Sequence, residues 1–298
     1  MAKRIEAAEA DLIVAATEAA RARGAWGLVV PIAGGHACAA EAGSPMNKVV
    51  GVGFGGLPEV EVFTDIERRF GGLGVDVQVE LCNLADPGIA TELTGRGYRL
   101  VGFENVLGLA LPAAPRRTAV GVEIRRADVD ELGAWIDTVV EGFAHPDGVG
   151  VPGHEEFPHD IVARAFGDFA TAGAIAYLAR YDGVVAGGAS MRLTAGVAQL
   201  TGATTVASFR RRGVQSALLA ARLDEAAAAG ADIAVVTTAP GSTSQKNVQR
   251  SGFQLLYTRA VLVRDADQGV AGMAAGAAEK THAVSHTAEA TTASAPGM

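Results

Sequence analysis

The most informative segment of the chain is Ser208-Phe-Arg-Arg-Arg-Gly-Val-Gln-Ser-Ala-Leu-Leu219. Residues 197–206, before it, are mostly apolar or β-branched and predict a strand, whereas residues 216–229, after it, are strong helix formers. A basic turn is therefore expected to lead from a strand into a helix. The first N–H groups of a helix have no intrahelical acceptor and carry the positive end of its dipole, so they suit an anionic diphosphate.

The composition of this turn also favours an anion. Gly213 has no Cβ that would keep a ligand away from the backbone, and Arg210, Arg211 and Arg212 offer charge-assisted donors to phosphate oxygens. A Walker phosphate loop is the weakest interpretation, because no Gly-Lys-Ser/Thr follows the glycine. A basic helix start that binds no ligand stays as the alternative interpretation.

The pattern Arg210-x-x-Gly213-x-Gln215 resembles the Arg/Gln-x-x-Gly-x-Gly/Ala coenzyme A loop of the GNAT N-acyltransferases. The resemblance continues through residues 230–239, which match the next strand of that superfamily, and through Ser244-Gln-Lys-Asn247, which matches its Asn-bearing helix. Gly252-Phe253 matches its Gly-Phe signature. The order and spacing of these motifs, over about residues 120–264, identify half of the chain as a member of this superfamily.

The resemblance implies an α/β protein of the α+β type, with a mixed, mainly antiparallel sheet flanked by helices. Two adjacent strands of that sheet separate, and the acyl-pantetheine arm lies between them. Acetyl-coenzyme A is the expected cosubstrate, and no metal ion is expected. The residues that the resemblance assigns to coenzyme binding are Thr204, Thr205, Val206, Arg210, Arg211, Arg212, Gly213, Val214, Gln215, Ser216 and Asn247.

The chain departs from its relatives at the expected general acid. Many GNAT enzymes carry a Tyr four residues before the Gly-Phe pair, but that position is Val248 here. A thiol of low pKa can leave without an acid, so catalysis is not excluded. Ser244, Tyr257 or a water molecule are the substitutes, although Tyr257, on the last predicted strand, also suits a packed core position.

Acidic and histidine residues gather around the end of the first predicted helix of this half, residues 129–143, and the loop after it. In this fold that region normally overhangs the acceptor, so the cluster indicates an acceptor with positive charge and offers a proton acceptor such as Glu141. A solvated acidic loop is the alternative. The cluster consists of Glu141, His145, Asp147, His154, Glu155, Glu156 and His159.

The two halves of the chain repeat one order of elements at an offset of 155 residues. The offset aligns residues 47–54 with 202–209 and Gly97-Tyr98 with Gly252-Phe253. In the first copy the basic turn is replaced by Gly55-Gly-Leu-Pro-Glu-Val60, in which Pro58 has no N–H and Glu59 repels phosphate. We therefore predict tandem GNAT-like domains of which the first, degenerate copy holds no coenzyme. An unrelated N-terminal α/β domain is the alternative.

The predicted boundaries follow from composition. Residues 1–113 form the degenerate N-terminal domain, 114–118 a Pro-punctuated linker, 119–265 the acetyltransferase domain and 266–298 a disordered tail rich in Ala, Thr and Ser. Within the second domain, residues 174–180 and 184–193 are predicted strands, and Tyr181-Asp-Gly183 is predicted to join them as a hairpin.

The chain has 298 residues, 49% of them hydrophobic, and a net charge of −8. This balance argues against general nucleic-acid binding. No apolar run approaches the roughly 20 residues that span a bilayer, and no signal peptide is evident, so we expect a cytoplasmic protein. Cys38 and Cys82 lack the spacing of a zinc site.

The favoured function is an N-acetyltransferase that moves an acetyl group from acetyl-coenzyme A to a primary amine of a small molecule or protein. A non-catalytic sensor of acyl-coenzyme A is the alternative from a different class, since the usual Tyr is missing and the first copy is degenerate. Regulation of nucleic acid through Arg210, Arg211 and Arg212 is a third. A homodimer stays open, and the sequence does not reveal the acceptor.

Overall fold

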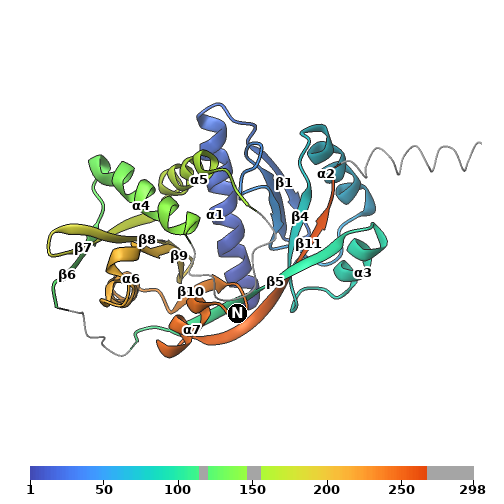
Figure 1. The fold of residues 1–298 in the computed structure, drawn as a ribbon. Coiled ribbons are helices and arrows are strands. Elements are labelled where there is room, and N and C mark those ends of the chain that lie inside the picture. The colour runs from blue at the N-terminus through green and yellow to red at the C-terminus, as the bar shows by residue number, and fades with distance from the viewer. Residues whose placement is uncertain (114–119, 146–155, 267–298) are drawn as a thin grey trace, which may run out of the picture.

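The computed structural model describes residues 1–113, 120–145 and 156–266. Within these residues the strands form one sheet of 11 strands, flanked by helices (Figure 1). The order across the sheet is β1-β2-β3-β4-β11-β5-β10-β9-β8-β7-β6.

The first half of the chain contributes three helices and five strands to the described structure. They are α1 (Ala2–Ala22), β1 (Leu28–Ile32), β2 (Gly35–Ala39), β3 (Lys48–Val50), α2 (Val60–Gly72), β4 (Val77–Cys82), α3 (Gly88–Gly95) and β5 (Arg99–Ala110).

The second half contributes the remaining elements, including short 3₁₀ turns at Val129–Glu131 and Ala207–Phe209. They are β6 (Val122–Arg126), α4 (Leu132–Ala144), α5 (His159–Thr171), β7 (Ile175–Tyr181), β8 (Val184–Thr194), β9 (Val197–Thr205), α6 (Val214–Ala228), β10 (Ile233–Thr238), α7 (Thr243–Arg250) and β11 (Gln254–Arg264). The predicted strand, basic turn and helix around residue 210 are therefore present.

The internal repeat is confirmed by the element bounds. Helix α7 begins at Thr243 and α3 at Gly88, and strand β11 begins at Gln254 and β5 at Arg99, which in both cases is a separation of 155 residues. The order of elements from α1 to β5 matches the order from α5 to β11, and β6 and α4 are extra elements of the second half.

The two halves exchange their last strands. Strand β5 pairs in antiparallel fashion with both β10 and β11, and β11 also pairs with β4 of the first half. Figure 1 shows β11 crossing the molecule to lie beside β4. The predicted class, two related halves with a mixed sheet and flanking helices, is confirmed, but both halves share one continuous sheet instead of forming two.

Helices cover both faces of the sheet. Alternate residues of a strand point to opposite faces, and along β4 Val79 and Leu81 pack in the cluster that contains α2 and α3, whereas Cys82 packs with α1. In the second half, Leu178 of β7 packs with α4 and α5, and Ala179 packs with α6. Helices α1, α4 and α5 thus share one face, and α2, α3 and α6 lie on the other.

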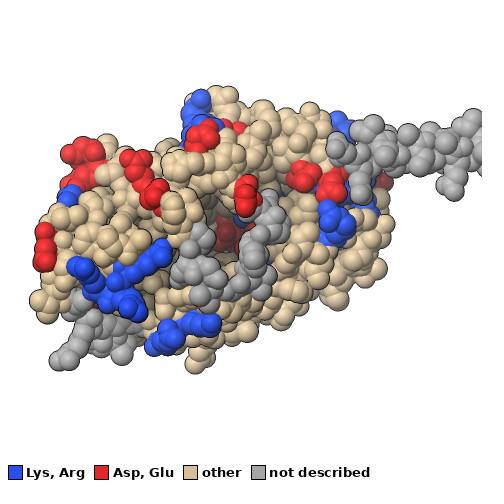
Figure 2. Space-filling view, in the orientation of Figure 1, with Lys and Arg blue, Asp and Glu red and all other residues tan. Residues whose placement is uncertain are grey.

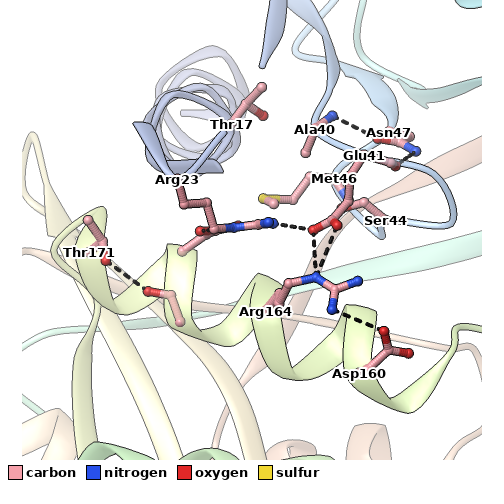
Figure 3. Close-up of polar contacts among 12 residues, drawn as sticks. Thr17, Arg23, Ala40, Glu41, Ser44, Met46, Asn47, Asp160, Arg164 and Thr171 are labelled. Atoms are coloured by element: carbon pink, nitrogen blue, oxygen red, sulfur yellow. Dashed lines mark hydrogen bonds and ion pairs between the residues drawn. The ribbon is translucent and has the colours of Figure 1, made fainter. Parts of the chain in front are cut away.

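Ion pairs fix α5 to the first half of the chain. Arg23, which follows α1, donates to Asp168 of α5 at 3.0 and 2.9 Å and also contacts Glu41. Figure 3 shows Glu41 between Arg23 and Arg164, whose Nε donates to the Glu41 carboxylate at 3.0 Å. Arg164 also pairs with Asp160, one turn earlier on α5. The first half therefore holds the helix whose first residue, His159, faces the site described below.

Candidate active site

Strands β9 and β10 pair over a short length and then separate. Their parallel pairing runs from Val197 opposite Ile233 to Gln199 opposite Val235, although β9 continues to Thr205 and β10 to Thr238. The edge of β9 beyond Gln199 is thus left unpaired on the side of β10. This is the separation of strands that the sequence resemblance implies.

A β-bulge bends β9 at this point. The register against β8 shifts between Gly188 and Ser190, where β9 contains Gly202 with a φ of +57°. Arg222 of α6 is buried beneath the bulge and donates to the carbonyl oxygens of Ser190 at 3.1 Å and Thr201 at 3.4 Å. Burial lowers the pKa of this guanidinium to about 10. The bulge is therefore supported by a donor from the helix that follows the basic turn.

The basic turn presents a run of free backbone donors. Gly213, with a φ of +83°, precedes α6, and Arg211 also has a positive φ of 63°. Among the described residues, no group accepts a hydrogen bond from the backbone N–H groups of residues 211–216. These donors lie at the positive end of α6, so they form a ready site for a diphosphate.

The arginine side chains of the turn are exposed, and two of them have defined contacts. Arg210 Nη2 donates to the carbonyl oxygen of His145 at the end of α4, at 2.8 Å. The Arg212 guanidinium lies over the rings of Tyr181, at 5.3 Å, and Phe209, at 5.6 Å. Figure 2 shows Lys and Arg side chains gathered over α6 and α7. This positive surface suits a polyanion.

Helix α7 is joined to the first turn of α6. Asn247 Nδ2 donates to Gln215 Oε1 at 3.0 Å, and Asn247 Oδ1 accepts from Arg250 at 3.2 Å. Ser242 caps α7 by accepting from the N–H of Gln245 at 3.1 Å. Ser244 is exposed on the same helix. The structure thus brings together Asn247 and Gln215, two residues that the resemblance assigns to coenzyme binding.

An open cavity of about 400 Å³ lies beside the end of β9. Its lining includes three residues of the sequence-based set, Glu141, His159 and Val206, together with Asp137 and Thr138. Asp137 was missed by the sequence analysis, although it lies four residues before Glu141 and so on the same face of α4.

The rest of the predicted acidic and histidine cluster is less closely grouped in the structure. The exposed Glu141 carboxylate lies 3.1 Å from His145 Nδ1. Glu156 is exposed, and Asp147, His154 and Glu155 lie outside the described residues.

The end of β9 carries the three residues expected to meet pantetheine. Thr204 packs so closely on α4 that a Cβ on Gly142 would lie 1.7 Å from Thr204 Oγ1. Thr205 Oγ1 is buried without a partner among the described residues, and the N–H of Val206 donates to Ala186 at 3.0 Å. Because its N–H is already bonded, we expect Val206, which lines the cavity, to contact pantetheine through its side chain.

Tyr257 lies apart from this group. Its ring is buried, and its hydroxyl donates to Glu6 Oε1 of α1 at 2.6 Å. Val248 faces the core on the inner side of α7 and is 7% exposed. Both side chains are thus packed in the core.

The start of the corresponding turn in the first copy is bonded to the loop between β1 and β2. The N–H groups of Gly53 and Gly55 both donate to the carbonyl oxygen of Ala33, at 3.0 and 2.8 Å. A Cβ on Gly34 would lie 2.8 Å from the nitrogen of Gly55, so the turn lies directly on the backbone between β1 and β2. That the first copy holds no coenzyme stays a prediction, and it rests on Pro58, which has no N–H, and on Glu59, which would repel a phosphate.

Two negative findings apply to the described part of the chain. None of its helices has the length and apolar character that a bilayer crossing requires. Within the same residues, no group of His, Cys, Asp and Glu side chains is arranged to hold a metal ion.

Residues 144–253 match the acetyltransferase (GNAT) family, and no curated protein sequence matches the chain. Among solved structures, a GCN5-related N-acetyltransferase from Kribbella flavida is 19% identical, with a TM-score of 0.58 over 85% of this chain and 95% of that one. A tandem GNAT protein from the clavulanic acid biosynthesis pathway is 12% identical, with a TM-score of 0.52 over 69% of each chain. A GCN5-related N-acetyltransferase from Sphaerobacter thermophilus is 17% identical, with a TM-score of 0.50 over 69% of this chain and 66% of that one.

At these identities the structural likeness concerns the fold. The family match, in contrast, spans the end of α4, the bulged strand, the basic turn and α7. The segment 144–253 therefore belongs to the GNAT acetyltransferase family, and the chain has the fold of a tandem GNAT protein.

Proposed function

We propose that this protein is an N-acetyltransferase that moves the acetyl group of acetyl-coenzyme A to a primary amine. The observation that carries the proposal is the run of free N–H groups at residues 211–216, placed beside the point where β9 leaves β10. A diphosphate on these donors would direct the pantetheine arm toward the unpaired edge of β9. The turn of the first copy also has N–H groups without an acceptor among the described residues, but Pro58 interrupts that run and Glu59 would repel a phosphate.

In this arrangement most of the rate enhancement would come from holding the thioester and the amine in the correct orientation. Arg210 and Arg212 would neutralise phosphate charge, and the pair of Asn247 and Gln215 would meet the start of the pantetheine arm. For the leaving thiolate we propose Ser244 or a water molecule as proton donor in preference to Tyr257, whose hydroxyl already donates to Glu6. Glu141 would contribute negative charge to the cavity on the acceptor side.

The coenzyme site is tested by calorimetric titration with coenzyme A. Gly213→Glu places a carboxylate in the phosphate site, so we expect the Kd to rise by at least about 100-fold, or about 2.7 kcal/mol. Gly56→Glu is the matched control, because Gly56 has a similar φ of +90° in the turn of the first copy. It should bind coenzyme A like the parent. Equal affinity of parent and Gly213→Glu would refute the site.

Turnover separates the enzyme from a sensor of acyl-coenzyme A. Release of free thiol from acetyl-coenzyme A is followed in the presence of a panel of primary amines. Amine-dependent release supports the transferase, whereas tight binding without release for every amine supports the sensor.

A further inference from the structure

A cluster of charged side chains lies in the middle of the sheet, on the face covered by α1. Figure 2 shows acidic atoms at the bottom of a hollow in the centre of the molecule. The cluster joins both halves of the chain, because Arg259 comes from β11 and its partners come from α1, β4 and β5. Its members are Glu6, Glu9, Lys48, Glu80, Glu104 and Arg259.

Two of the four carboxylates are well paired. Glu6 Oε1 lies 2.7 Å from Arg259 Nη2, and Glu80 contacts both Lys48 and Arg259. Glu104 Oε2, in contrast, lies 3.6 Å from Arg259 Nη1, which is too long for a hydrogen bond. Among the described residues no cation forms an ion pair with Glu9, which accepts from Gln199 Nε2 at 2.9 Å. Glu9 therefore has no cation of its own in that part of the chain, and Glu104 has only the longer contact with Arg259, so their negative charge is compensated incompletely.

Unpartnered acceptors next to these carboxylates indicate a ligand with N–H donors. Gln199 is 2% exposed, and its Oε1 is buried with no donor among the described residues. Glu104 Oε2 is also buried without a donor in that part of the chain, while its side chain as a whole is 32% exposed. An ammonium group offers three donors and a positive charge. Arg192 lies opposite Gln199 on β8, and its Nη1 is buried with no acceptor among the described residues. This nitrogen could donate to a polar group of the same ligand.

The position of these residues in the sheet relates them to the coenzyme site. Gln199 is the last residue of β9 that pairs with β10, so it marks the point where the strands separate. On β5, Val106 pairs with Thr237 of β10. Glu104 lies two residues before Val106 in the chain, and therefore on the same face of the sheet. Thr237 is exposed. An acyl group carried along the free edge of β9 from the basic turn would thus arrive near Glu104 and Gln199.

We propose that the acceptor's ammonium group binds between Glu9, Glu104 and Gln199, and that Glu104 takes a proton from it. The proposal depends on the acetyltransferase function proposed above and assigns its base to the first half of the chain. The substrate class it names is an amine that arrives protonated.

The proton and electron balance of the step is complete with the reactants named. Glu104 removes one proton from the ammonium group, and the freed lone pair attacks the thioester carbonyl carbon. A C–N bond forms and the C–S bond breaks, so that the thiolate leaves with its electron pair and receives the second nitrogen proton, directly or through water. The proton on Glu104 then passes to solvent, and the products are an amide and a thiol.

The environment of Glu104 suits a base that works near neutral pH. Burial, and then the charge of Glu80 on β4, raise the pKa of Glu104 to about 7. Lys48 on β3 and Arg259 on β11 act in the opposite direction, and Glu9 on α1 adds a further upward effect. A carboxylate with a pKa close to the working pH is an effective general base.

The test uses the full chain with 1,4-diaminobutane, benzylamine and glycinamide as probes. Amine binding to the coenzyme A-loaded protein is measured by calorimetry, and thiol release from acetyl-coenzyme A is followed between pH 6 and 9. The variants are Glu104→Gln and Glu9→Gln, with Glu123→Gln as control, because Glu123 is exposed on the edge strand β6.

For at least one probe we expect Glu104→Gln to lower kcat by about 10²- to 10⁴-fold at pH 7. The parent's rate should rise with pH around an apparent pKa near 7, and Glu104→Gln should lack this rise. Its kcat should be reduced less at pH 9, where more of the amine is already neutral. Glu9→Gln should weaken amine binding at least tenfold and keep that rise, and Glu123→Gln should match the parent.

Two results would overturn the inference while coenzyme A still binds as proposed. The first is parent-like kcat and pH profile in Glu104→Gln, and the second is a parent that binds none of the probes. Failure of the proposed function gives a different result, namely coenzyme affinity that Gly213→Glu does not change.

Discussion

Arg259 is the residue on which the central charge cluster depends. Its side chain is 1% exposed and lies within ion-pair distance of Glu6, Glu80 and Glu104. Removing one partner of a buried ion pair leaves charge without compensation, which costs more than the intact pair contributes. The guanidinium therefore keeps three carboxylates in place at the junction of the two halves.

Arg259→Met tests this role because it keeps much of the side-chain volume and removes the charge. We expect the free energy of unfolding at pH 8 to fall by about 3 to 5 kcal/mol, measured by urea denaturation. Arg126→Met is the control, because Arg126 is 62% exposed in its pair with Glu225, and its loss should cost less than about 1 kcal/mol. A similar, small loss in both variants would contradict the structural role.

Residues of the candidate coenzyme site could be named from the sequence where they lie in a short local motif. Arg210, Gly213 and Asn247 lie in motifs of a few residues, and the structure joins these motifs around the first turn of α6. Glu9, Glu104 and Gln199 have no such signal, because they come from three distant segments that meet only in the folded sheet. Tyr257 shows the same limit: its burial against Glu6 depends on α1, 251 residues away.

At the scale of elements, the contact between α4 and β9 sets the width of the acceptor-side cavity. Gly142 of α4 has space for a hydrogen atom only, since a Cβ would lie 1.7 Å from Thr204 Oγ1 and 2.5 Å from Thr204 Cβ. Any larger residue must push α4 away from the strand end that lines the cavity.

Gly142→Ala is therefore expected to lower both stability and acetyl transfer, although Ala is the better helix former by about 1 kcal/mol. Gly133→Ala on the same helix is the control, because the added Cβ would have no described atom within 4 Å outside its chain neighbours and the backbone of α4. The control should be neutral or slightly stabilised. Thermal denaturation and initial rates check both variants, and a Gly142→Ala protein as stable and active as the control would refute the tight contact.

The sequence also predicted most elements, for identifiable reasons. Asp182 and Gly183 have positive φ angles of 49° and 83°, as a two-residue hairpin turn requires, and the predicted hairpin of β7 and β8 is confirmed. The exchange of β5 and β11 was not predicted. Both strands follow a Gly-aromatic pair in equivalent positions, so the local sequence fits a partner from either half equally well.

At the scale of the whole molecule, the exchanged strands couple the two halves. β5 pairs with β10 on one side and β11 on the other, and β11 pairs in turn with β4. Ion pairs between Arg23 and Asp168 join the halves a second time, through α1 and α5. Neither half completes its sheet without the other.

We therefore predict one cooperative unfolding transition. The chain has two tryptophans, Trp26 in the first half and Trp135 in the second, so Trp135→Phe and Trp26→Phe each leave a reporter in one half. In each variant the fluorescence midpoint in urea should coincide with the midpoint from far-UV circular dichroism, which reports on both halves. Separated midpoints in either variant would show that the halves unfold independently.

The crossing of β5 and β11 bears on the evolutionary fate of the first repeat. Deleting that repeat would remove the strand between β10 and β11 and leave two open backbone edges, which invite aggregation. Changes in its turn, residues 55–60, expose no such edge, because the turn contributes no strand to the sheet. If the first copy holds no coenzyme, as predicted, its last strand is still needed to complete the sheet, which gives selection an architectural reason to preserve the repeat.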